Sequence, residues 1–151
     1  TANPYPYATK LIRHIQKHLN KKVVILDETG RYWLDFKYKS FRSYGPREII
    51  NLFKNASFII SSSFHGAAFS VNFQKDFYSL FPKGVKDERQ ESLLKLIGAE
   101  NRFIHVGDPL PSPSAFEIQN WKQISEKLNA YREHSIKYLT SALENATKPA
   151  K

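Results

Sequence analysis

The sequence predicts an α/β domain in which helices cover both faces of a parallel sheet of four or five strands. Short apolar runs, which are typical of buried strands, alternate along the chain with segments whose apolar residues recur at helical spacing. This alternation is typical of βαβ units, whose strands pair in parallel. The length of 151 residues suffices for one such domain with a sizeable core. We therefore expect a single three-layer domain over residues 1–144 and a disordered polar tail over residues 145–151.

The first half of the chain is predicted to hold two helices and one strand. Residues 5–20 are expected to form an amphipathic helix on the spacing of their apolar side chains, namely Tyr7, Leu11, Ile12, Ile15 and Leu19. The continuous apolar run at residues 23–26 predicts a strand buried on both faces. Residues 28–44 mix aromatic and basic side chains and are expected to form a loop with short irregular pieces. Gly45-Pro46 then begins a helix that ends at Asn55, since proline is favoured in the first helical turn.

The second half is predicted to supply three more strands, at residues 57–62, 77–81 and 103–106. Helices are expected between them at residues 65–73 and 87–97, and Gly98 is expected to end the second. Three prolines within residues 107–114 predict an extended linker. A long helix then begins near Asn120, and its spacing predicts a buried face made of Trp121, Ile124, Leu128, Tyr131, Ser135 and Tyr138.

The composition limits the kinds of site that the chain can hold. The chain has no cysteine, which excludes disulfides and thiolate metal sites and agrees with a cytoplasmic location. His14 and His18 lie four residues apart without a neighbouring carboxylate, so we expect no metal site. No apolar run approaches the ~20 residues of a membrane span, so no transmembrane segment is expected. The chain lacks methionine, which suggests a fragment of a longer protein.

The formal net charge of +9 is dispersed along the sequence rather than gathered in one basic arm. Such a charge is compatible with an ordinary solvated surface, and it can also steer an anionic ligand toward the protein. A non-catalytic nucleic-acid-binding domain is a further alternative. Because the sequence contains no recognised nucleic-acid-binding motif, we expect no such partner.

The clearest candidate site is the polar turn that follows the strand at residues 57–62. It contains three serines and a His65-Gly66 pair, after which a run of small residues predicts a helix. In open α/β sheets, ligands bind at the carboxyl ends of the strands, and the free N–H groups of a helix N-terminus favour an anion. His65 could donate a proton or bind phosphate there. Alternatively, His65 makes only a structural hydrogen bond and the serines cap the helix.

Arg89 is a second candidate, because a guanidinium can hold a carboxylate or a phosphate through two hydrogen bonds. The alternative is a surface arginine paired with a neighbouring acid, since Asp87 and Glu88 precede it. The sequence has no Gly-x-Ser-x-Gly elbow, which argues against a hydrolase nucleophile. It also has no Gly-x-Gly-x-x-Gly or Walker loop, which argues against a standard dinucleotide or P-loop site.

Taken together, the motifs resemble those of the polysaccharide pyruvyl transferases. The resemblance covers residues 4–143 and rests on four ordered motifs: Gly45-Pro46-Arg47-Glu48, NASFIISSSFHGAAFS at residues 55–70, RQESLLKLIG at residues 89–98 with Arg102, and Trp121 with Ser135 and Leu139 in the final helix. Ser-Phe-His-Gly alone would be a weak signal, whereas four motifs at fitting separations are fairly specific.

The resemblance implies an enzyme that transfers enolpyruvate from phosphoenolpyruvate to two hydroxyls of a sugar, giving a pyruvate ketal in polysaccharide biosynthesis. Phosphoenolpyruvate is then the donor substrate, and no cofactor is expected. The implied fold is similar to the GT-B glycosyltransferases, whose active site lies between two Rossmann-like domains. This chain resembles the C-terminal half. A missing N-terminal domain of the same protein would help to hold the saccharide acceptor, so the chain alone is expected to be inactive.

The resemblance also implies roles for individual residues. His65 would contact the donor as the catalytic residue, either as general acid or as phosphate ligand, beside the donor-binding residues Ser63, Phe64 and Gly66. Some members carry an arginine where this chain has Ser63, and Arg89 is our candidate to replace that charge. By the same resemblance, three residues would line the cleft, namely Gly45, Pro46 and Glu48.

A different enzyme remains possible from the sequence, namely the nucleotide-sugar-binding half of a GT-B glycosyltransferase. That function would need a carboxylate on the ribose hydroxyls, and Glu48 is the obvious local candidate.

Overall fold

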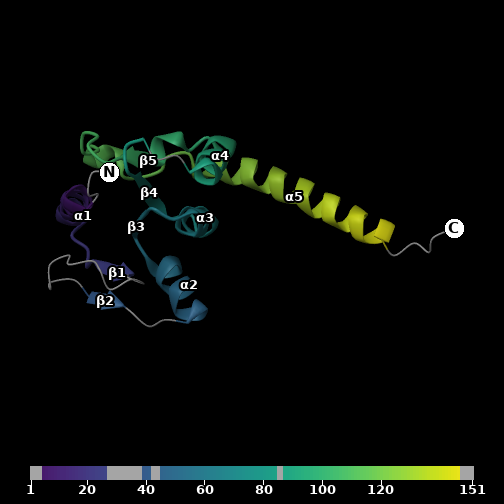
Figure 1. The fold of residues 1–151 in the computed structure, drawn as a ribbon, viewed down its shortest axis with the longest axis horizontal. Coiled ribbons are helices and arrows are strands. Elements are labelled where there is room, and N and C mark those ends of the chain that lie inside the picture. Colours follow the sequence, from purple (N-terminus) through teal and green to yellow (C-terminus); the bar gives the residue numbers. More distant parts are fainter. Residues whose placement is uncertain (1–4, 27–38, 42–44, 85–86, 147–151) are drawn as a thin grey trace.

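The computed structural model describes residues 5–26, 39–41, 45–84 and 87–146, and within them it shows an α/β fold with two parallel sheets (Figure 1). Strands β1 (Val24–Leu26) and β2 (Lys39–Phe41) form the smaller sheet. The larger sheet has the strand order β3-β4-β5. Its strands are β3 (Phe58–Ser61), β4 (Asp76–Phe81) and β5 (Phe103–His105). The helices are α1 (Tyr5–Leu19), α2 (Pro46–Asn55), α3 (Phe64–Asn72), α4 (Glu88–Ile97) and α5 (Trp121–Ala146), with short 3₁₀ turns η1 (Glu100–Arg102) and η2 (Pro113–Ala115).

The larger sheet sets the place of the candidate site. Its strands pair in parallel, with Ser61 opposite Ser79 and Phe81 opposite His105. All three carboxyl ends therefore lie at one edge of the sheet. Helices α3 and α4 follow β3 and β4, so both helices begin at that edge. Ligands of open α/β sheets bind at this edge.

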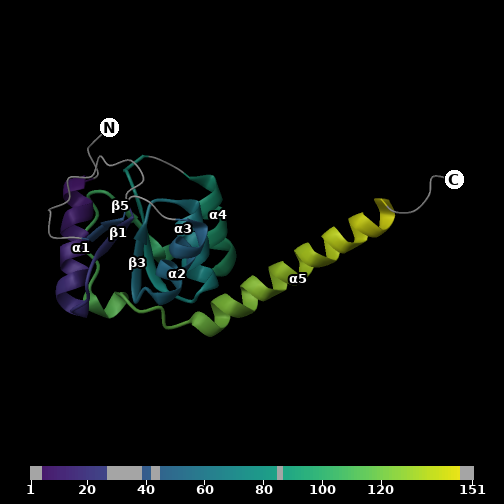
Figure 2. The same ribbon diagram turned by 90° about the horizontal axis from the view of Figure 1, so that it is seen from below.

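Helices cover both faces of this sheet, as the sequence predicted (Figure 2). On one face, side chains from α3, α4 and the start of α5 join those of β3 and β4 in one core, which includes Ile59, Ala67, Val71, Phe77, Leu94, Ile97 and Ile124. On the other face, α1 packs through a second core, made of Leu11, Ile15, Tyr78, Leu80, Ile104 and Phe116. The larger sheet is thus the middle of three layers.

A buried arginine forms hydrogen bonds with the linker that follows β5, on the face of the sheet that α1 covers. Arg102 is almost fully buried, and its Nη1 donates to the carbonyl oxygens of Ala115 and Phe116, each at 3.0 Å. Its guanidinium lies 5.2 Å from the ring centre of Tyr78, whose hydroxyl also donates to the Ala115 carbonyl at 2.8 Å. Burial lowers the pKa of Arg102 and raises the pKa of Tyr78. Arg102 therefore has a structural explanation that requires no ligand.

The predicted single sheet is wrong in one respect, because β1 pairs with β2 and not with the larger sheet. The predicted burial of the first strand on both faces is also wrong, since Val24 and Leu26 are 44% and 40% exposed. A two-stranded sheet leaves much of its surface to solvent, and this explains the difference. β2 lies in the segment that the sequence predicted to be a loop, of which residues 27–38 and 42–44 lie outside the described part.

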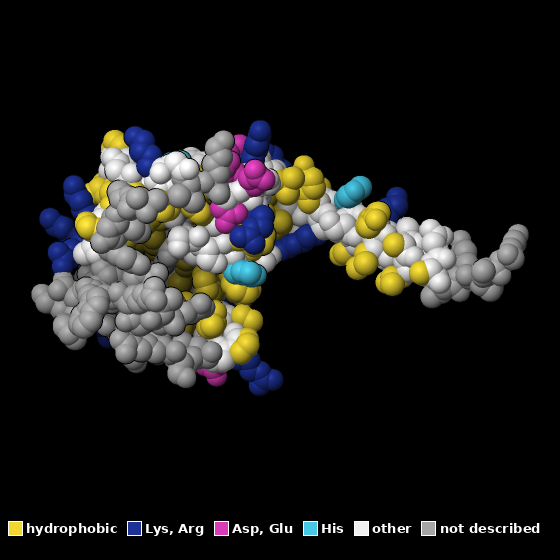
Figure 3. All heavy atoms as spheres, viewed as in Figure 1, with side chains coloured by type: hydrophobic (Ala, Val, Ile, Leu, Met, Phe, Trp, Pro, Cys, Tyr) yellow, Lys and Arg dark blue, Asp and Glu magenta, His cyan; other side chains and the backbone are white. Residues whose placement is uncertain are grey.

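The predicted buried face of the last helix is confirmed in its first part, where Ile124 is buried and Trp121 and Leu128 pack against the core, but it is wrong further along. Of the described residues of α5, only Ile124 is buried, while Tyr131 and Ser135 are exposed and Tyr138 is 74% exposed. The second half of α5 projects from the body of the domain (Figures 1 and 2). Apolar side chains gather on this projecting part (Figure 3), and they include Tyr131, Ile136, Tyr138, Leu139 and Leu143. The spacing indicates an amphipathic helix correctly, but it does not say what covers the apolar side.

Helix α5 also includes Asn145 and Ala146, which the sequence assigned to a polar tail. Residues 147–151 of that predicted tail lie outside the described part. Among the described helices, none has both the length and the apolar character that crossing a bilayer requires.

Two leucines on helices provide a matched test of this packing. Leu94 of α4 is fully buried, and Leu139 of α5 is exposed. We expect Leu94→Ala to lower the free energy of unfolding by about 2–5 kcal/mol, because it leaves a cavity in the core. Leu139→Ala should change it by less than about 0.5 kcal/mol. Urea unfolding of both variants gives the measurement, and an equal loss for Leu139→Ala would show that the outer half of α5 is covered.

Candidate functional site

The turn between β3 and α3 is shaped by its own serines. Ser61 ends the strand, and its Oγ accepts the N–H of Ser63 at 3.1 Å. Ser63 is the N-cap of α3, with extended backbone, and its Oγ accepts the N–H of Gly66 at 3.4 Å. These bonds agree with the capping role that the sequence allowed for the serines.

Gly66 allows α3 to approach the end of β3 closely. A Cβ at this position would overlap Ser61 Oγ and lie only 2.6 Å from Ser61 Cβ. Gly66 is buried, and its carbonyl accepts the Ser70 hydroxyl at 2.7 Å. Gly66 thus has a packing role that accounts for a glycine here, while its predicted contact with a donor stays a prediction.

The exposed end of α3 offers unpaired hydrogen-bond donors. Among the described residues, the backbone N–H groups of Phe64 and His65 have no hydrogen-bond partner. His65 is exposed, which fits its place in a turn at the carboxyl edge of the sheet. Unpaired N–H groups at a helix N-terminus, together with the helix dipole, favour a negatively charged ligand.

The structure brings Arg89 of α4 to this turn. Its guanidinium carbon lies 5.7 Å from the ring centre of Phe64, and the Phe64 and His65 rings are 5.9 Å apart. The side chain of Arg89 is 72% exposed, so a ligand could reach it. His65 and Arg89, which the sequence predicted as separate candidates, therefore both lie beside the Phe64 ring.

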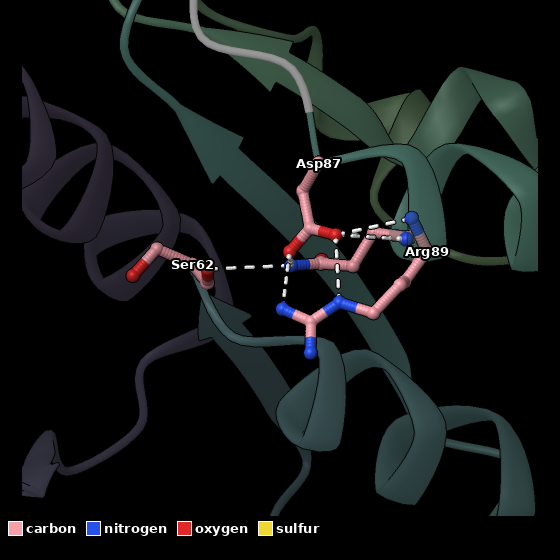
Figure 4. Close-up of polar contacts among 4 residues, drawn as sticks. Ser62, Asp87 and Arg89 are labelled. Carbon is pink, nitrogen blue, oxygen red and sulfur yellow. Dashed lines mark hydrogen bonds and ion pairs between the residues drawn. The ribbon is translucent and has the colours of Figure 1, made fainter.

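Asp87 holds Arg89 in this place (Figure 4). Asp87 is the N-cap of α4, and its Oδ1 accepts the backbone N–H of Arg89 at 3.1 Å and the Arg89 Nε at 3.3 Å. Its Oδ2 accepts Arg89 Nη2 at 3.5 Å and Gln90 Nε2 at 3.2 Å. Burial acts to raise the pKa of Asp87, but the hydrogen bonds from Gln90 and Arg89 and the arginine charge lower it overall. The carboxylate is therefore ionised at neutral pH and pairs with the guanidinium.

Asp87 and Gln90 were not among the residues predicted for the site. Their spacing of three matches a capping box, in which the third residue after an N-cap is Glu or Gln. That signal locates the start of α4. It does not reveal that Gln90 Nε2 also donates to the Ser62 carbonyl at 3.3 Å, because that contact joins residues 28 positions apart.

The three residues predicted to line the cleft lie on the surface of the domain. Gly45, Pro46 and Glu48 are exposed at the start of α2. Within the described ranges, no hydrogen bond, ion pair or ring contact joins them to residues 61–66. Helix α2 contacts α3 through its second half, where the Phe53 and Phe69 rings are 5.3 Å apart. The cleft-lining role of Gly45, Pro46 and Glu48 stays a prediction.

No group of three His, Asp or Glu side chains suited to a metal ion occurs in residues 5–26, 39–41, 45–84 and 87–146.

The fold and the site define an α/β domain with a candidate anion site at the carboxyl edge of its parallel sheet. A sequence model of the polysaccharide pyruvyl transferases matches residues 4–80, slightly more than half of the 151 residues, and the chain belongs to this family. No curated protein sequence and no solved structure matches it. The matched segment includes the turn with His65 but not Arg89, and the resemblance predicted for the later motifs lies beyond it.

We expect Gly66→Ala to destabilise the domain by roughly 1–3 kcal/mol, because the new methyl group must push α3 away from Ser61. Thermal unfolding provides the measurement. Ser61→Gly in the same chain should restore part of the loss, since it removes the two atoms that the methyl group would overlap. A Gly66→Ala variant as stable as the wild type would show that the turn tolerates a wider separation.

The pH dependence of stability tests the hydrogen bonds of Asp87. Because its pKa is lowered in the folded chain, Asp87 stabilises the fold above its ordinary value of about 3.9, and this stabilisation is lost as the pH falls through the lowered pKa. Asp87→Asn keeps the cap but removes the charge. The free energy of unfolding of the wild type should therefore exceed that of the variant by less than about 1 kcal/mol near pH 6. The difference should vanish toward pH 2 in urea unfolding. Leu139→Ala, which is exposed and removes no titratable group, is the control whose difference from the wild type should not depend on pH.

Proposed function

We propose that this chain is the donor-binding domain of an enzyme that transfers enolpyruvate from phosphoenolpyruvate to two hydroxyls of a sugar. Family membership supports a pyruvyl transferase. The observation that carries the choice of donor is the meeting around Phe64 of Arg89, His65 and two backbone N–H groups that have no partner among the described residues. Phosphoenolpyruvate bears a phosphate and a carboxylate, and this group of donors suits two anionic groups on one small molecule.

The two kinds of hydrogen-bond donor in this site suit the two anionic groups of phosphoenolpyruvate. The start of α3 presents N–H groups and the positive end of the helix dipole, an arrangement that favours phosphate. The guanidinium of Arg89 faces the same turn and can hold a carboxylate through two hydrogen bonds. In this proposal Arg89 supplies the positive charge that Ser63 lacks.

The transfer requires proton movement and charge stabilisation. A proton added to the methylene carbon makes the adjacent carbon electrophilic, and a sugar hydroxyl attacks that carbon and gives up its own proton. The bond between this carbon and the phosphate oxygen then breaks, phosphate leaves with the electron pair, and the second hydroxyl attacks the same carbon and loses its proton to close the ketal. His65 contacts the donor either as the general acid or as the imidazolium that binds phosphate.

The acceptor side of the site belongs, in this proposal, to a second α/β domain of the same protein in a GT-B-like arrangement. The parallel sheet with helices on both faces supports a Rossmann-like half. His65 and Arg89 are exposed, so this chain alone does not exclude water from the reacting groups. We also propose a cytoplasmic location, for which the absence of cysteine is the support.

Calorimetric titration with phosphoenolpyruvate tests the donor site. Arg89→Ala should weaken binding roughly ten- to hundredfold, since it removes charged hydrogen bonds, and His65→Ala should weaken it as well. The free energy of unfolding of both variants should lie within about 0.5 kcal/mol of the wild-type value, because both side chains are exposed. Arg132→Ala and His134→Ala on α5 are the matched controls, and they should bind like the wild type.

Three results, from this titration, from a titration with nucleotide sugars and from an assay of phosphate release, would contradict the proposal. Equal binding by the His65 and Arg89 variants would remove these residues from the site. Tight binding of nucleotide sugars without binding of phosphoenolpyruvate would favour the glycosyltransferase alternative. Positioning of the acceptor can supply about 7–11 kcal/mol of a barrier. Release of phosphate by this chain alone, with a galactoside acceptor, would therefore contradict the need for a second domain.

A further inference from the structure

We propose that Gln90 is a positioning residue that fixes Arg89 over the donor turn and thereby sets the affinity for the donor. The role in donor binding rests on the proposed function, whereas the effect of Gln90 on Arg89 can be measured without any ligand.

Gln90 joins two segments that are distant in the sequence. Its side chain is fully buried in the third position of α4. The amide nitrogen donates both to the Ser62 carbonyl at 3.3 Å and to Asp87 Oδ2 at 3.2 Å (Figure 4). One amide group thus connects the turn before α3 with the first turn of α4.

The carboxylate of Asp87 transmits this constraint to Arg89. Its two oxygens accept Arg89 Nε and Nη2, so the guanidinium lies against a carboxylate that Gln90 itself holds. Without this contact, a mostly exposed arginine has many rotamers to lose when a ligand binds. The contact therefore orders the guanidinium before the ligand arrives, at 5.7 Å from the Phe64 ring centre.

The side-chain carbonyl oxygen of Gln90 indicates that packing alone does not account for a glutamine at this position. Gln90 Oε1 is buried and, within the described part of the chain, has no hydrogen-bond partner. An unpaired buried carbonyl lowers stability, and an apolar side chain of similar shape would avoid this loss. The donor contacts of the amide nitrogen are therefore what this glutamine contributes, and both lead to the candidate site.

A purely structural role is the competing explanation, in which Gln90 only ties α4 to the turn. The two explanations differ in how the effects of replacing Gln90 and Arg89 on donor affinity combine. If Gln90 acts through Arg89, its removal has no further effect on donor affinity once the guanidinium is gone. If Gln90 acts on the fold in general, the two losses add.

The test is a double-mutant cycle on this chain with phosphoenolpyruvate as the titrated ligand. Gln90→Met keeps the shape of the side chain and removes the amide. We expect about tenfold weaker binding for Gln90→Met, the larger loss for Arg89→Ala, and no additional loss in the double variant. Leu94→Ala, one turn further along α4 and equally buried, is the control that should lower the unfolding midpoint and leave the affinity unchanged.

Unchanged affinity in Gln90→Met, or losses that add in the double variant, would overturn the proposal. If Gln90→Met does not fold, Gln90→Leu takes its place, since it also removes the amide and introduces no charge beside Asp87. If the wild type does not bind phosphoenolpyruvate, the proposed function fails, and the NMR signal of the Arg89 Nε–H group decides the positioning role. That signal should show a restrained side chain in the wild type and a mobile one in the variant. Equal mobility would overturn the inference.

Discussion

The candidate site depends on how closely helix α3 approaches the end of strand β3. The absence of a side chain at Gly66 permits this approach, because Ser61 occupies the space that a Cβ would need. The turn is consequently tight, and it presents the first N–H groups of α3 at the carboxyl edge of the sheet. The same geometry brings the Ser62 carbonyl within reach of Gln90 on the neighbouring helix. Packing between a strand and a helix thus determines which polar groups a ligand would meet.

Sequence reasoning succeeded where structure follows from local chemistry. The strand, serine turn and helix at residues 58–72 and the helix between Asp87 and Gly98 were placed within one or two residues. In the second case a carboxylate caps the first turn and a glycine in the left-handed conformation ends the helix. These signals act within a few residues, and a single sequence therefore contains them. The exposure of His65 could also be predicted, since it follows from the position of a turn at the edge of a sheet.

Sequence reasoning failed where contacts between distant segments decide the outcome. The apolar run before Leu26 indicates a strand but not its partner, and β2, which is only three residues long, gives no signal of its own. The apolar side chains of α5 recur at helical spacing whether or not anything covers them. Arg89 was a candidate because of the chemistry of its guanidinium and as a replacement for a missing charge. Its place over Phe64 depends on the arrangement of α3 and α4, which no local pattern encodes.

The order of the strands in the larger sheet has a consequence for how the chain folds. β3, β4 and β5 are neighbours in space in the same order as in the sequence, and the polar contacts of the candidate site lie within residues 61–90. Contacts of short sequence separation form with little loss of loop entropy. Helix α1 instead needs Ile104 and Phe116, about 90 residues or more further along, to complete its core. During synthesis, α1 is made before these partners, so its core can be completed only after residue 116 has left the ribosome.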